Sequence, residues 1–346
     1  VAGGCGFIGS HFVRLCLKEN YQVVNLDALT YAASPGSLRD IKDNKDYIFR
    51  EGKIQDSQLV RSILEQFKPQ AVINFAAETH VDRSIDSPHQ FIESNVVGAF
   101  NLLSESKLYF SSLLPAEREN FRFLHISTDE IFGSCKEEPF KESAPCNPSS
   151  PYAASKAAAD LIIKSYYHTY NFPIIITNCT NNYGPNQFPE KLIPHMIIKG
   201  IHNESLPLYG NGMQIRDWLY VEDHADAILK VLEKGKPGNT YNIAGLNGEI
   251  SNKDVVEEIC EVLNISRPRK DNKRYQELIV HVTDRPGHDF RYALDIEKIQ
   301  LELEWFPQTS FKEGIRKTIQ WYLDNQWWWQ EILDEGYEPN RIGLKS

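Results

Sequence analysis

The sequence predicts an α/β fold in which a doubly wound parallel sheet carries helices on both faces and a smaller mixed α/β domain is attached. Three observations favour this class. A glycine-rich turn leads directly into a helical pattern, short apolar runs alternate with helical stretches, and Asn, Pro and Gly become frequent after about residue 180. The 346 residues suffice for one large unit or two joined domains.

The elements follow one another in a strand, helix, strand order. Apolar residues from Phe7 to Leu17 recur at helical spacing, and an apolar run over 21–26 ends at Asp27. Further strands are expected within 71–76, 121–127 and 173–177. A helix within 218–232 and a strand at 240–243 are predicted to return to the same sheet, so the chain crosses between the domains more than once. Residues 1–180 plus 214–245 then form the sheet domain, and residues 181–213 plus 246–346 the second domain.

Composition narrows the class of protein. Lys and Arg number 37 against 47 Asp and Glu, a net charge of −10 that disfavours binding to nucleic acid or to an acidic membrane. No apolar run approaches the ~18 residues of a membrane span and no leader precedes the first motif, so we expect a cytoplasmic protein. The six cysteines have no CxxC spacing, and neither a metal site nor disulfides are expected. Because the first two residues run straight into glycines, we expect the natural chain to begin earlier.

The glycines have the spacing of a dinucleotide-binding turn. Gly3, Gly6 and Gly9 form G-x-x-G-x-x-G, and residues 4–9 also satisfy G-x-G-x-x-G. Such glycines let a pyrophosphate approach the backbone at a helix N-terminus. Asp27 ends the next strand at the distance expected for a carboxylate that holds a ribose hydroxyl, and it would repel a 2′-phosphate. The pattern therefore favours NAD over NADP, the alternative being an ordinary strand–helix turn with a chance Asp.

A tyrosine and a lysine share one helical face. Tyr152 and Lys156 are four residues apart, and Pro151 suits the first turn of a helix. An ammonium beside a phenol favours the phenolate, so we expect the pKa of Tyr152 to lie below its usual value of about 10 and the side chain to act as a general base. The alternative is an exposed pair with no chemical role.

Two adjacent acids follow the strand predicted at 121–127. Thr128, Asp129 and Glu130 lie at its carboxyl end, where open α/β sheets bind their ligands. Two carboxyls in different surroundings can serve as an acid and a base. The same residues would equally suit the N-terminal cap and first turn of a helix.

Taken together, these motifs resemble the extended short-chain dehydrogenase/reductase superfamily, and within it the nucleotide-sugar 4,6-dehydratases. The resemblance covers essentially the whole chain and implies a Rossmann-like fold. Its most specific stretches are Ala76-Ala77-Glu78-Thr79-His80-Val81-Asp82-Arg83-Ser84, Asn181-Asn182-Tyr183-Gly184-Pro185, Arg216-Asp217-Trp218-Leu219-Tyr220-Val221-Glu222-Asp223-His224 and Asp284-Arg285-Pro286-Gly287-His288-Asp289.

The resemblance implies an NAD-dependent hydro-lyase that forms a 4-keto-6-deoxy sugar, with dTDP-glucose as the expected substrate. In this scheme Tyr152 removes the proton of the 4-hydroxyl, Lys156 lowers its pKa, and Thr128 binds the 4-oxygen. Glu130 takes the C5 proton while Asp129 protonates the leaving 6-hydroxyl. The alternatives are a dehydratase or epimerase for another nucleotide sugar, and a catalytically weakened NAD or nucleotide-sugar binding protein.

The resemblance also assigns the binding residues. The NAD contacts it implies are Gly3, Gly6, Phe7, Ile8, Gly9, Asp27, Ala28, Leu29, Thr30, Ile54, Ala76, Ala77, Ser94, Tyr152, Lys156 and Asn182. The nucleotide-sugar contacts it implies are Thr79, Thr128, Asn181, Lys191, Leu192, Pro207, Tyr209, Arg216, Asn252, Arg285 and His288. Guanidinium groups at 216 and 285 suit a diphosphate, the alternative for each arginine being a surface ion pair.

Two further expectations come from the same resemblance. Helices near 91–108 and 153–170 are those that form a homodimer in the family, although their apolar faces could equally belong to a monomer core. The sequence departs from the family at Ala2, Lys53, Phe132 and Asn178, where Thr, Asp, Tyr and Arg are usual. A lysine at 53 cannot accept a hydrogen bond from an adenine amino group.

Overall fold

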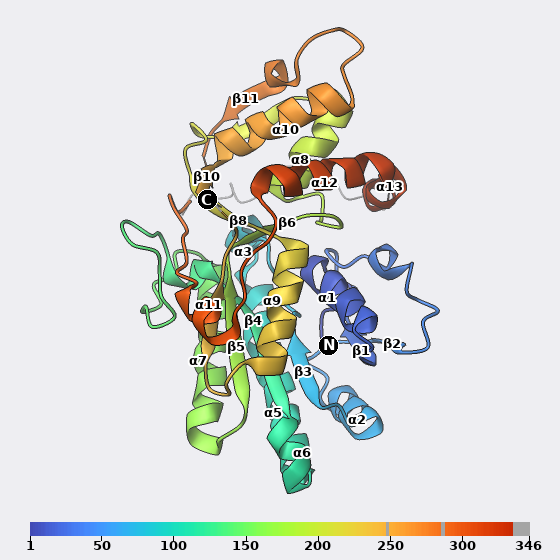
Figure 1. Ribbon diagram of the computed structural model, residues 1–346, viewed down its shortest axis with the longest axis vertical. Coiled ribbons are helices and arrows are strands. Elements are labelled where there is room, and N and C mark those ends of the chain that lie inside the picture. The colour runs from blue at the N-terminus through green and yellow to red at the C-terminus, as the bar shows by residue number, and fades with distance from the viewer. Residues whose placement is uncertain (247–248, 285–287, 335–346) are drawn as a thin grey trace.

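The computed structural model describes residues 1–246, 249–284 and 288–334 of the chain. Figure 1 shows a larger lobe built around a sheet and a smaller helical lobe above it. The elements of the first half are α1 (Phe7–Lys18), β1 (Val23–Asp27), η1 (Pro35–Leu38), β2 (Tyr47–Glu51), α2 (Ser57–Phe67), β3 (Ala71–Asn74), α3 (Val81–Asp86), α4 (Pro88–Phe91), η2 (Ile92–Gly98), α5 (Ala99–Ser112), α6 (Pro115–Asn120), β4 (Arg122–Thr128), η3 (Asp129–Phe132) and α7 (Pro151–Tyr170). Those of the second half are β5 (Ile174–Cys179), β6 (Asn181–Tyr183), α8 (Leu192–Ile201), β7 (Leu206–Tyr209), β8 (Ile215–Tyr220), α9 (Val221–Lys234), β9 (Thr240–Ile243), β10 (Glu249–Ser251), α10 (Asn252–Ser266), η4 (Tyr275–Leu278), β11 (Ile279–Val282), α11 (Glu297–Leu303), α12 (Phe311–Asp324) and α13 (Gln326–Asp334).

The main sheet is parallel and has the strand order of a Rossmann fold. Strands β2 and β1 pair on one side, and β3, β4, β5 and β9 pair in that order on the other. Ala2 joins the two parts, since it bridges Leu26 of β1 and Asn74 of β3. The first residues thus occupy the central position of the sheet, where the direction of winding reverses and ligands bind. The predicted fold class is confirmed.

Helices cover both faces of this sheet because successive strand residues point to opposite sides. Phe123 packs with side chains of α2, α5 and α7, whereas its neighbour Leu124 packs with those of α1, α9 and α11. Ile174 and Ile175 of β5 divide in the same way. The run of apolar residues in each strand therefore reflects burial on both faces.

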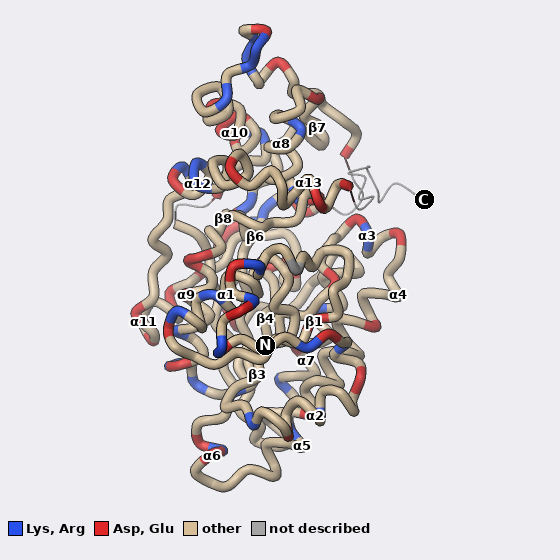
Figure 2. The backbone as a smooth tube through the Cα atoms, turned by 90° about the vertical axis from the view of Figure 1, so that its right-hand side faces the viewer, with Lys and Arg blue, Asp and Glu red and all other residues tan. Residues whose placement is uncertain are grey.

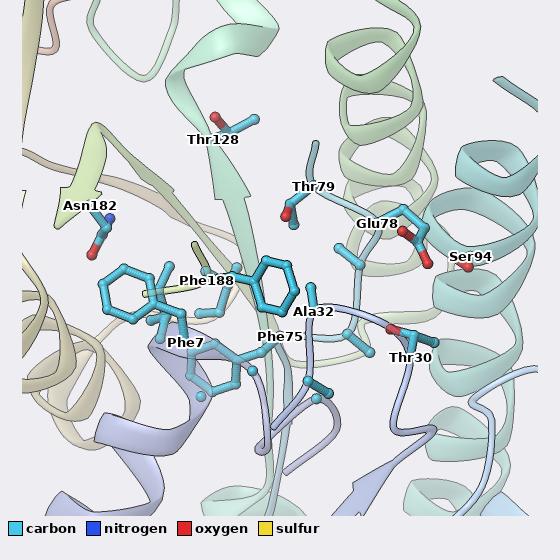
Figure 3. Close-up of a pocket in the computed structure, with 18 of the residues that line it drawn as sticks. Phe7, Thr30, Ala32, Phe75, Glu78, Thr79, Ser94, Thr128, Asn182 and Phe188 are labelled. Atoms are coloured by element: carbon cyan, nitrogen blue, oxygen red, sulfur yellow. The ribbon is translucent and has the colours of Figure 1, made fainter. Parts of the chain in front are cut away.

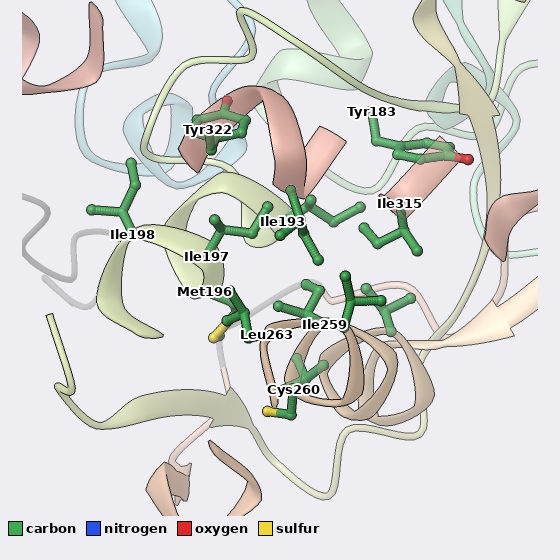
Figure 4. Packing of buried hydrophobic residues seen from close by; sticks show 14 of the residues in the cluster. Tyr183, Ile193, Met196, Ile197, Ile198, Ile259, Cys260, Leu263, Ile315 and Tyr322 are labelled. Carbon is green, nitrogen blue, oxygen red and sulfur yellow. The ribbon is translucent and has the colours of Figure 1, made fainter. Parts of the chain in front are cut away.

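The smaller lobe has its own buried core, shown in Figure 4. Strands β6, β8 and β10 form one sheet, and β7 pairs with β11. Side chains of α8, α10 and α12, among them Ile197, Ile259 and Ile315, fill the space between them. The proposed residue boundaries between two domains stay a prediction, while the return of β9 to the main sheet confirms that the chain crosses between the lobes more than once.

One predicted helix begins later than expected. Residues 218–220 belong to strand β8, which pairs with β6 and β10, and the helix starts only at Val221. The side chains of 218–220 are almost fully buried in β8. Glu222 and Asp223 lie in the first turn of α9, where negative charge favours the helix N-terminus.

The last helix of the described chain packs against an early loop. The indole Nε1 of Trp328 in α13 donates to Ser37 Oγ at 3.2 Å, and the Arg39 guanidinium lies 5.5 Å from the Trp327 ring centroid. Trp327 and Trp328 thus connect α13 to the segment around Ser37 and Arg39.

Charged residues are spread over the whole surface. Figure 2 shows Lys and Arg positions interspersed with Asp and Glu in both lobes. In the part of the chain that the structure describes, no helix has the length and apolar character needed to cross a membrane.

Candidate active site

A cavity of about 300 Å³ opens at the carboxyl ends of the main-sheet strands. Its walls come from the glycine turn, the ends of β1 and β4, and the segments that follow β3 and β5. Figure 3 shows Phe7, Phe75 and Phe188 at one part of this cavity, with Thr79 and Thr128 lying farther along it. The position is the ligand crevice of open α/β sheets.

The glycine turn leaves no room for side chains. Gly3 has a φ of +81°, and a Cβ placed on Gly9 would lie 2.3 Å from the Gly3 carbonyl oxygen. Helix α1 begins at Phe7, directly after the turn, so its free backbone amides lie beside the cavity. The turn therefore offers the close backbone approach and the helix N-terminus that a pyrophosphate needs.

Asp27 at the end of β1 holds the backbone on either side of it. Its Oδ2 accepts the backbone N–H of Cys5 at 2.8 Å, and its Oδ1 accepts that of Leu29 at 2.9 Å. Burial raises the pKa of this carboxyl, and the two backbone hydrogen bonds oppose the shift. Lys53 is exposed and does not line the cavity, whereas its neighbour Ile54 does.

Fifteen of the sixteen predicted NAD contacts line this cavity. The exception is Leu29, which packs against the core between the sheet and α1 while its backbone supports Asp27. The fifteen residues that line the cavity lie in the glycine turn, at or after the ends of β1, β2 and β3, in η2, in the first turns of α7 and in β6.

Thr128, Asp129 and Glu130 lie where β4 passes into the short 3-10 helix η3. Thr128 Oγ1 accepts the Glu130 N–H at 3.3 Å and donates to Asp129 Oδ1 at 3.2 Å. Thr128 is therefore the N-terminal cap of η3, and Asp129 and Glu130 form its first turn while they also line the cavity. Asp129 is buried, and its Oδ2 has no hydrogen-bond partner among the described residues. Burial and the nearby Glu130 hold the pKa of Asp129 well above its usual range, which favours the protonated form of this carboxyl.

Tyr152 and Lys156 lie in the first turns of α7, whose N-terminus is capped by Ser150. Both side chains are buried, which excludes an exposed pair. Lys156 Nζ donates to the carbonyl oxygen of Ile126 at 2.7 Å. The expected lowering of the Tyr152 pKa is wrong for this chain alone: burial and the Glu130 charge raise it well above its usual value, and a hydrogen bond with Thr128 only partly opposes this. The spacing of Tyr152 and Lys156 does not reveal the desolvation of the phenolate, which opposes ionisation.

Part of the predicted nucleotide-sugar set lies at the same cavity. Thr79, Thr128, Asn181 and Lys191 line it, and Lys191 Nζ donates to the Thr79 carbonyl oxygen at 3.0 Å. Arg285 lies outside the described residues. The others lie away from the cavity walls, in or near β7, β8, α8 and α10, and their role stays a prediction: Leu192, Pro207, Tyr209, Arg216, Asn252 and His288.

Arg216 is buried, so it does not belong to a surface ion pair. Its guanidinium donates to the carbonyl oxygens of Ile215, Asp289 and Phe290 and lies 4.4 Å from the Tyr292 ring centroid. Its charge also acts on Asp129, where it favours the carboxylate. The smaller lobe thus brings a buried cation near the acidic pair.

Sequence reasoning missed several residues of the cavity wall, among them Glu78, Phe188 and Glu190. Glu78 falls within a stretch already singled out, so its position was available. Asn95 was missed as well. It lies in the π-helical segment η2, where its side chain joins the Glu78 backbone to Ser155 Oγ at 2.8–3.0 Å. No simple periodicity signals a π-helical turn, which is frequent at functional sites.

Three departures from the family pattern fit their surroundings. Ala2 is buried inside the sheet, and Phe132 packs on Phe140 with ring centroids 5.3 Å apart. Asn178 in β5 donates to Asn242 Oδ1 of β9 at 3.1 Å. The chain has thus accommodated these residues within its core.

Comparison with known proteins identifies relatives over nearly the full length. The family model described as GDP-mannose 4,6 dehydratase matches residues 1–318. A dTDP-glucose 4,6-dehydratase of Xanthomonas campestris is 51% identical over 344 residues, covering 99% of this chain and 98% of the relative. One of Neisseria meningitidis is 49% identical with the same coverage.

Solved structures of dTDP-glucose 4,6-dehydratases are also similar to this chain over nearly its full length. The dTDP-glucose 4,6-dehydratase of Bacillus anthracis in complex with NAD is 42% identical, with a TM-score of 0.84 over 96% of this chain and 98% of that one. The dTDP-glucose 4,6-dehydratase of Streptomyces venezuelae, with NAD bound, is 39% identical, with a TM-score of 0.86 and the same coverage.

Proposed function

We propose, since this chain belongs to the GDP-mannose 4,6 dehydratase family, that it is an NAD-dependent hydro-lyase that converts dTDP-glucose to dTDP-4-keto-6-deoxyglucose. The observation that carries the proposal is the meeting of five side chains at one cavity. Thr128, Asp129 and Glu130 from the end of β4 lie with Tyr152 and Lys156 of α7.

The residues of the cavity fit NAD. The glycine turn is so tight that a Cβ at Gly3 or Gly9 would collide with backbone atoms, and Asp27 lies at the end of β1 with its carboxylate fixed by two backbone amides. In our proposal the turn and the start of α1 hold the pyrophosphate, Asp27 holds a ribose, and Ser94 and Asn182 contribute further contacts. NAD supplies, when bound, a reversible store for the hydride that leaves C4 and returns to C6.

Tyr152 is the base of the first step. Its phenolate oxygen accepts the proton of the sugar 4-hydroxyl as C4 loses its hydride and becomes a ketone, and Thr128 donates a hydrogen bond to the sugar 4-oxygen. Lys156, with its Nζ fixed by the Ile126 carbonyl, supplies the positive charge that favours the phenolate. The buried position of both side chains keeps this proton transfer away from water.

Water loss then needs an acid and a base at adjacent carbons. The C4 ketone makes C5–H acidic, so Glu130 removes that proton while Asp129 gives its own to the departing 6-hydroxyl. The raised pKa of Asp129 supports the donor role, because the shift favours the protonated carboxyl, which is the form that can protonate a leaving group. Elimination releases one water and leaves a C5=C6 double bond. Hydride return to C6, with return of the proton from Glu130 to C5, then gives the 4-keto-6-deoxy sugar.

The test is conversion of substrate. Purified protein is mixed with NAD and dTDP-glucose, and the 4-keto sugar is followed by its absorbance in alkali and by mass spectrometry for the loss of one water. We expect product with the mass of the dehydrated sugar. Binding of NAD and substrate without product would contradict the proposal and leave a binding protein.

A second set of reactions tests the nucleotide. We expect dTDP-glucose to have a higher kcat/KM than the UDP-, GDP- and CDP-linked sugars. Faster turnover of GDP-mannose would keep the reaction class and replace the substrate.

We also propose that two copies of the chain pair through the faces of η2, α5 and α7. These segments carry the large apolar side chains Ile92, Val97, Phe100, Leu108 and Leu161, each exposed by more than 40% in the single chain. Such side chains are commonly covered in an oligomer interface. Sedimentation should give twice the mass of one chain, and Phe100→Glu with Leu161→Glu should return it to one. Ile265→Glu on α10, also at an exposed apolar residue, is the matched control.

A further inference from the structure

Lys156 contacts a group of polar side chains that none of the steps above uses. Lys156 Nζ lies 3.3 Å from His125 Nε2 of β4, and His125 in turn contacts Asn74 of β3 and Asp160 of α7, which bonds to Ser127. Asn74, His125, Ser127 and Asp160 are each no more than 4% exposed. Buried polar groups are costly unless they satisfy one another, so their joint presence beside a proposed catalytic lysine calls for a role.

The tautomer of His125 follows from its neighbours. Asn74 Oδ1 accepts the backbone N–H of Ala76 at 3.1 Å, which turns the amide nitrogen of Asn74 toward His125 Nδ1 at 3.2 Å. That ring nitrogen must therefore accept the hydrogen bond. Burial and the Lys156 charge lower the pKa of His125, so the ring is neutral and its one proton is on Nε2.

The Nε2–H group of His125 lies between a cation and an anion. It is 3.3 Å from Lys156 Nζ and 3.6 Å from Asp160 Oδ1. Since Nε2 carries a proton, it cannot accept from the ammonium, which is directed instead to the Ile126 carbonyl. Asp160 Oδ2 accepts from Ser127 Oγ at 2.6 Å, whereas Oδ1 has no hydrogen-bond partner among the described residues. The imidazole thus turns an N–H toward the unpaired carboxylate oxygen.

Lys156 and Asp160 each shift the pKa of the other toward its charged form. Burial lowers the pKa of Lys156, and the Asp160 charge, followed by that of Cys179 on β5, raises it again. Burial also raises the pKa of Asp160 to about 6, against the opposing effects of Lys156, Ser127 and Lys164. The titratable groups around Asp160 are these two lysines on α7, His125 on β4, and Cys146, whose thiol pKa the Asp160 charge raises.

We propose that Asp160 and His125 are positioning residues for Lys156. The carboxylate keeps the buried lysine an ammonium, and the neutral imidazole fixes the place of that carboxylate relative to it. The part of the proposal that concerns turnover rests on the proposed function, whereas the charge state of Lys156 does not.

The direct test is an NMR titration of the lysine side chains in the NAD-loaded protein, labelled with carbon-13 at Cε. The Lys156 signal is assigned by its absence in Lys156→Arg. In Asp160→Asn we expect the pKa of Lys156 to fall by about one unit or more, a tenfold change in proton affinity. An unchanged pKa would overturn the proposal.

Glu105→Gln is the matched control. This carboxylate on α5 is also buried and pairs with Arg61 at 2.9 Å, on the side of the sheet lobe where α5 meets α2. It should leave the Lys156 titration unchanged. If Asp160→Asn does not fold, Ser127→Ala provides the test. Ionisation of Asp160 should produce a step in the chemical shift of the Lys156 signal as pH rises. Loss of the Ser127 hydrogen bond should raise the pKa of Asp160 and so move that step to higher pH. An unmoved step contradicts the proposal.

Steady-state kinetics separate positioning from mere packing. In Asp160→Asn, kcat for dTDP-glucose should fall about tenfold or more while KM stays within about twofold, because Asp160 does not line the cavity proposed to bind the sugar. Unchanged kcat in a folded variant would contradict the role. If the wild-type chain forms no 4-keto sugar while Asp160→Asn still lowers the Lys156 pKa, the proposed function fails and the positioning role stands.

Discussion

The Asp27 carboxylate accepts the backbone N–H of Cys5 at 2.8 Å and so ties the end of β1 to the glycine turn. Its second oxygen accepts the N–H of Leu29. One side chain therefore sets the distance between the two segments that we propose to hold the pyrophosphate and the ribose.

Replacing Asp27 by Asn should weaken NAD binding. An amide has one acceptor oxygen, so in either orientation an NH₂ group faces one of the two backbone N–H groups. Loss of a hydrogen bond to a charged group costs about 1.5–3 kcal/mol, and we expect the Kd for NAD, measured by calorimetry, to rise at least about tenfold. Asp40→Asn, at an exposed ion pair with Arg14, should leave NAD affinity unchanged. Equal affinities of Asp27→Asn and wild type would refute the binding role.

The glycine turn predicts a contrast between two neighbouring substitutions. A Cβ on Gly9 would lie 2.3 Å from the Gly3 carbonyl oxygen, whereas a Cβ on Gly6 meets nothing closer than 3.4 Å. Gly9→Ala should lower the free energy of unfolding by about 2 kcal/mol or more, as in other overpacked sites, and Gly6→Ala by much less. Urea unfolding without NAD measures both. Similar losses would show that the turn moves to admit a side chain.

Glu130→Gln separates oxidation from water loss. The glutamine cannot accept the C5 proton, but Tyr152 and Lys156 remain. We expect the absorbance of reduced nicotinamide to appear after substrate is added, while dehydrated product forms at least about 100-fold more slowly than in the wild type. Full product formation would assign the C5 base to another residue.

Asp129 should destabilise the fold at neutral pH. Its pKa is raised in the native state, so between the unfolded value near 3.8 and the raised value the native chain binds more protons than the unfolded one. Stability therefore falls as pH rises through this window. Asp129→Asn should unfold at a higher temperature than wild type at pH 8, with the difference shrinking toward pH 4, and should lose dehydratase activity. A difference that stays constant with pH would contradict this.

Asp40, whose pKa is lowered where that of Asp129 is raised, provides the control for that experiment. Arg14 holds the pKa of Asp40 below its usual range, so the ionised form of Asp40 is the stabilising one. Asp40→Asn should lower the unfolding temperature slightly at pH 8, and this loss should vanish in acid, where the wild-type carboxyl is protonated.

The sequence predicted what depends on spacing along the chain. Gly3, Gly9 and Asp27 belong to one turn and one strand end, so their meeting at the cavity follows from the strand–helix–strand order. Glu190 and Asn95 could not be placed in this way, because their positions depend on a distant loop and on a π-helical turn. The pKa of Tyr152 was misjudged for a related reason: spacing puts Lys156 beside it, but only the packed structure reveals how far burial opposes the phenolate.

The bond from Trp328 to Ser37 has a consequence for synthesis of the chain. The loop that contains Ser37 also carries Ala32 and Ala33 of the cavity wall, and it gains its support from α13 only after nearly three hundred more residues have been made. Strand β9, which completes the main sheet, also arrives late. The segments that support this cavity wall and complete the sheet therefore come together only after residues up to α13 have been synthesised, so the first half of the chain alone cannot form the supported cavity.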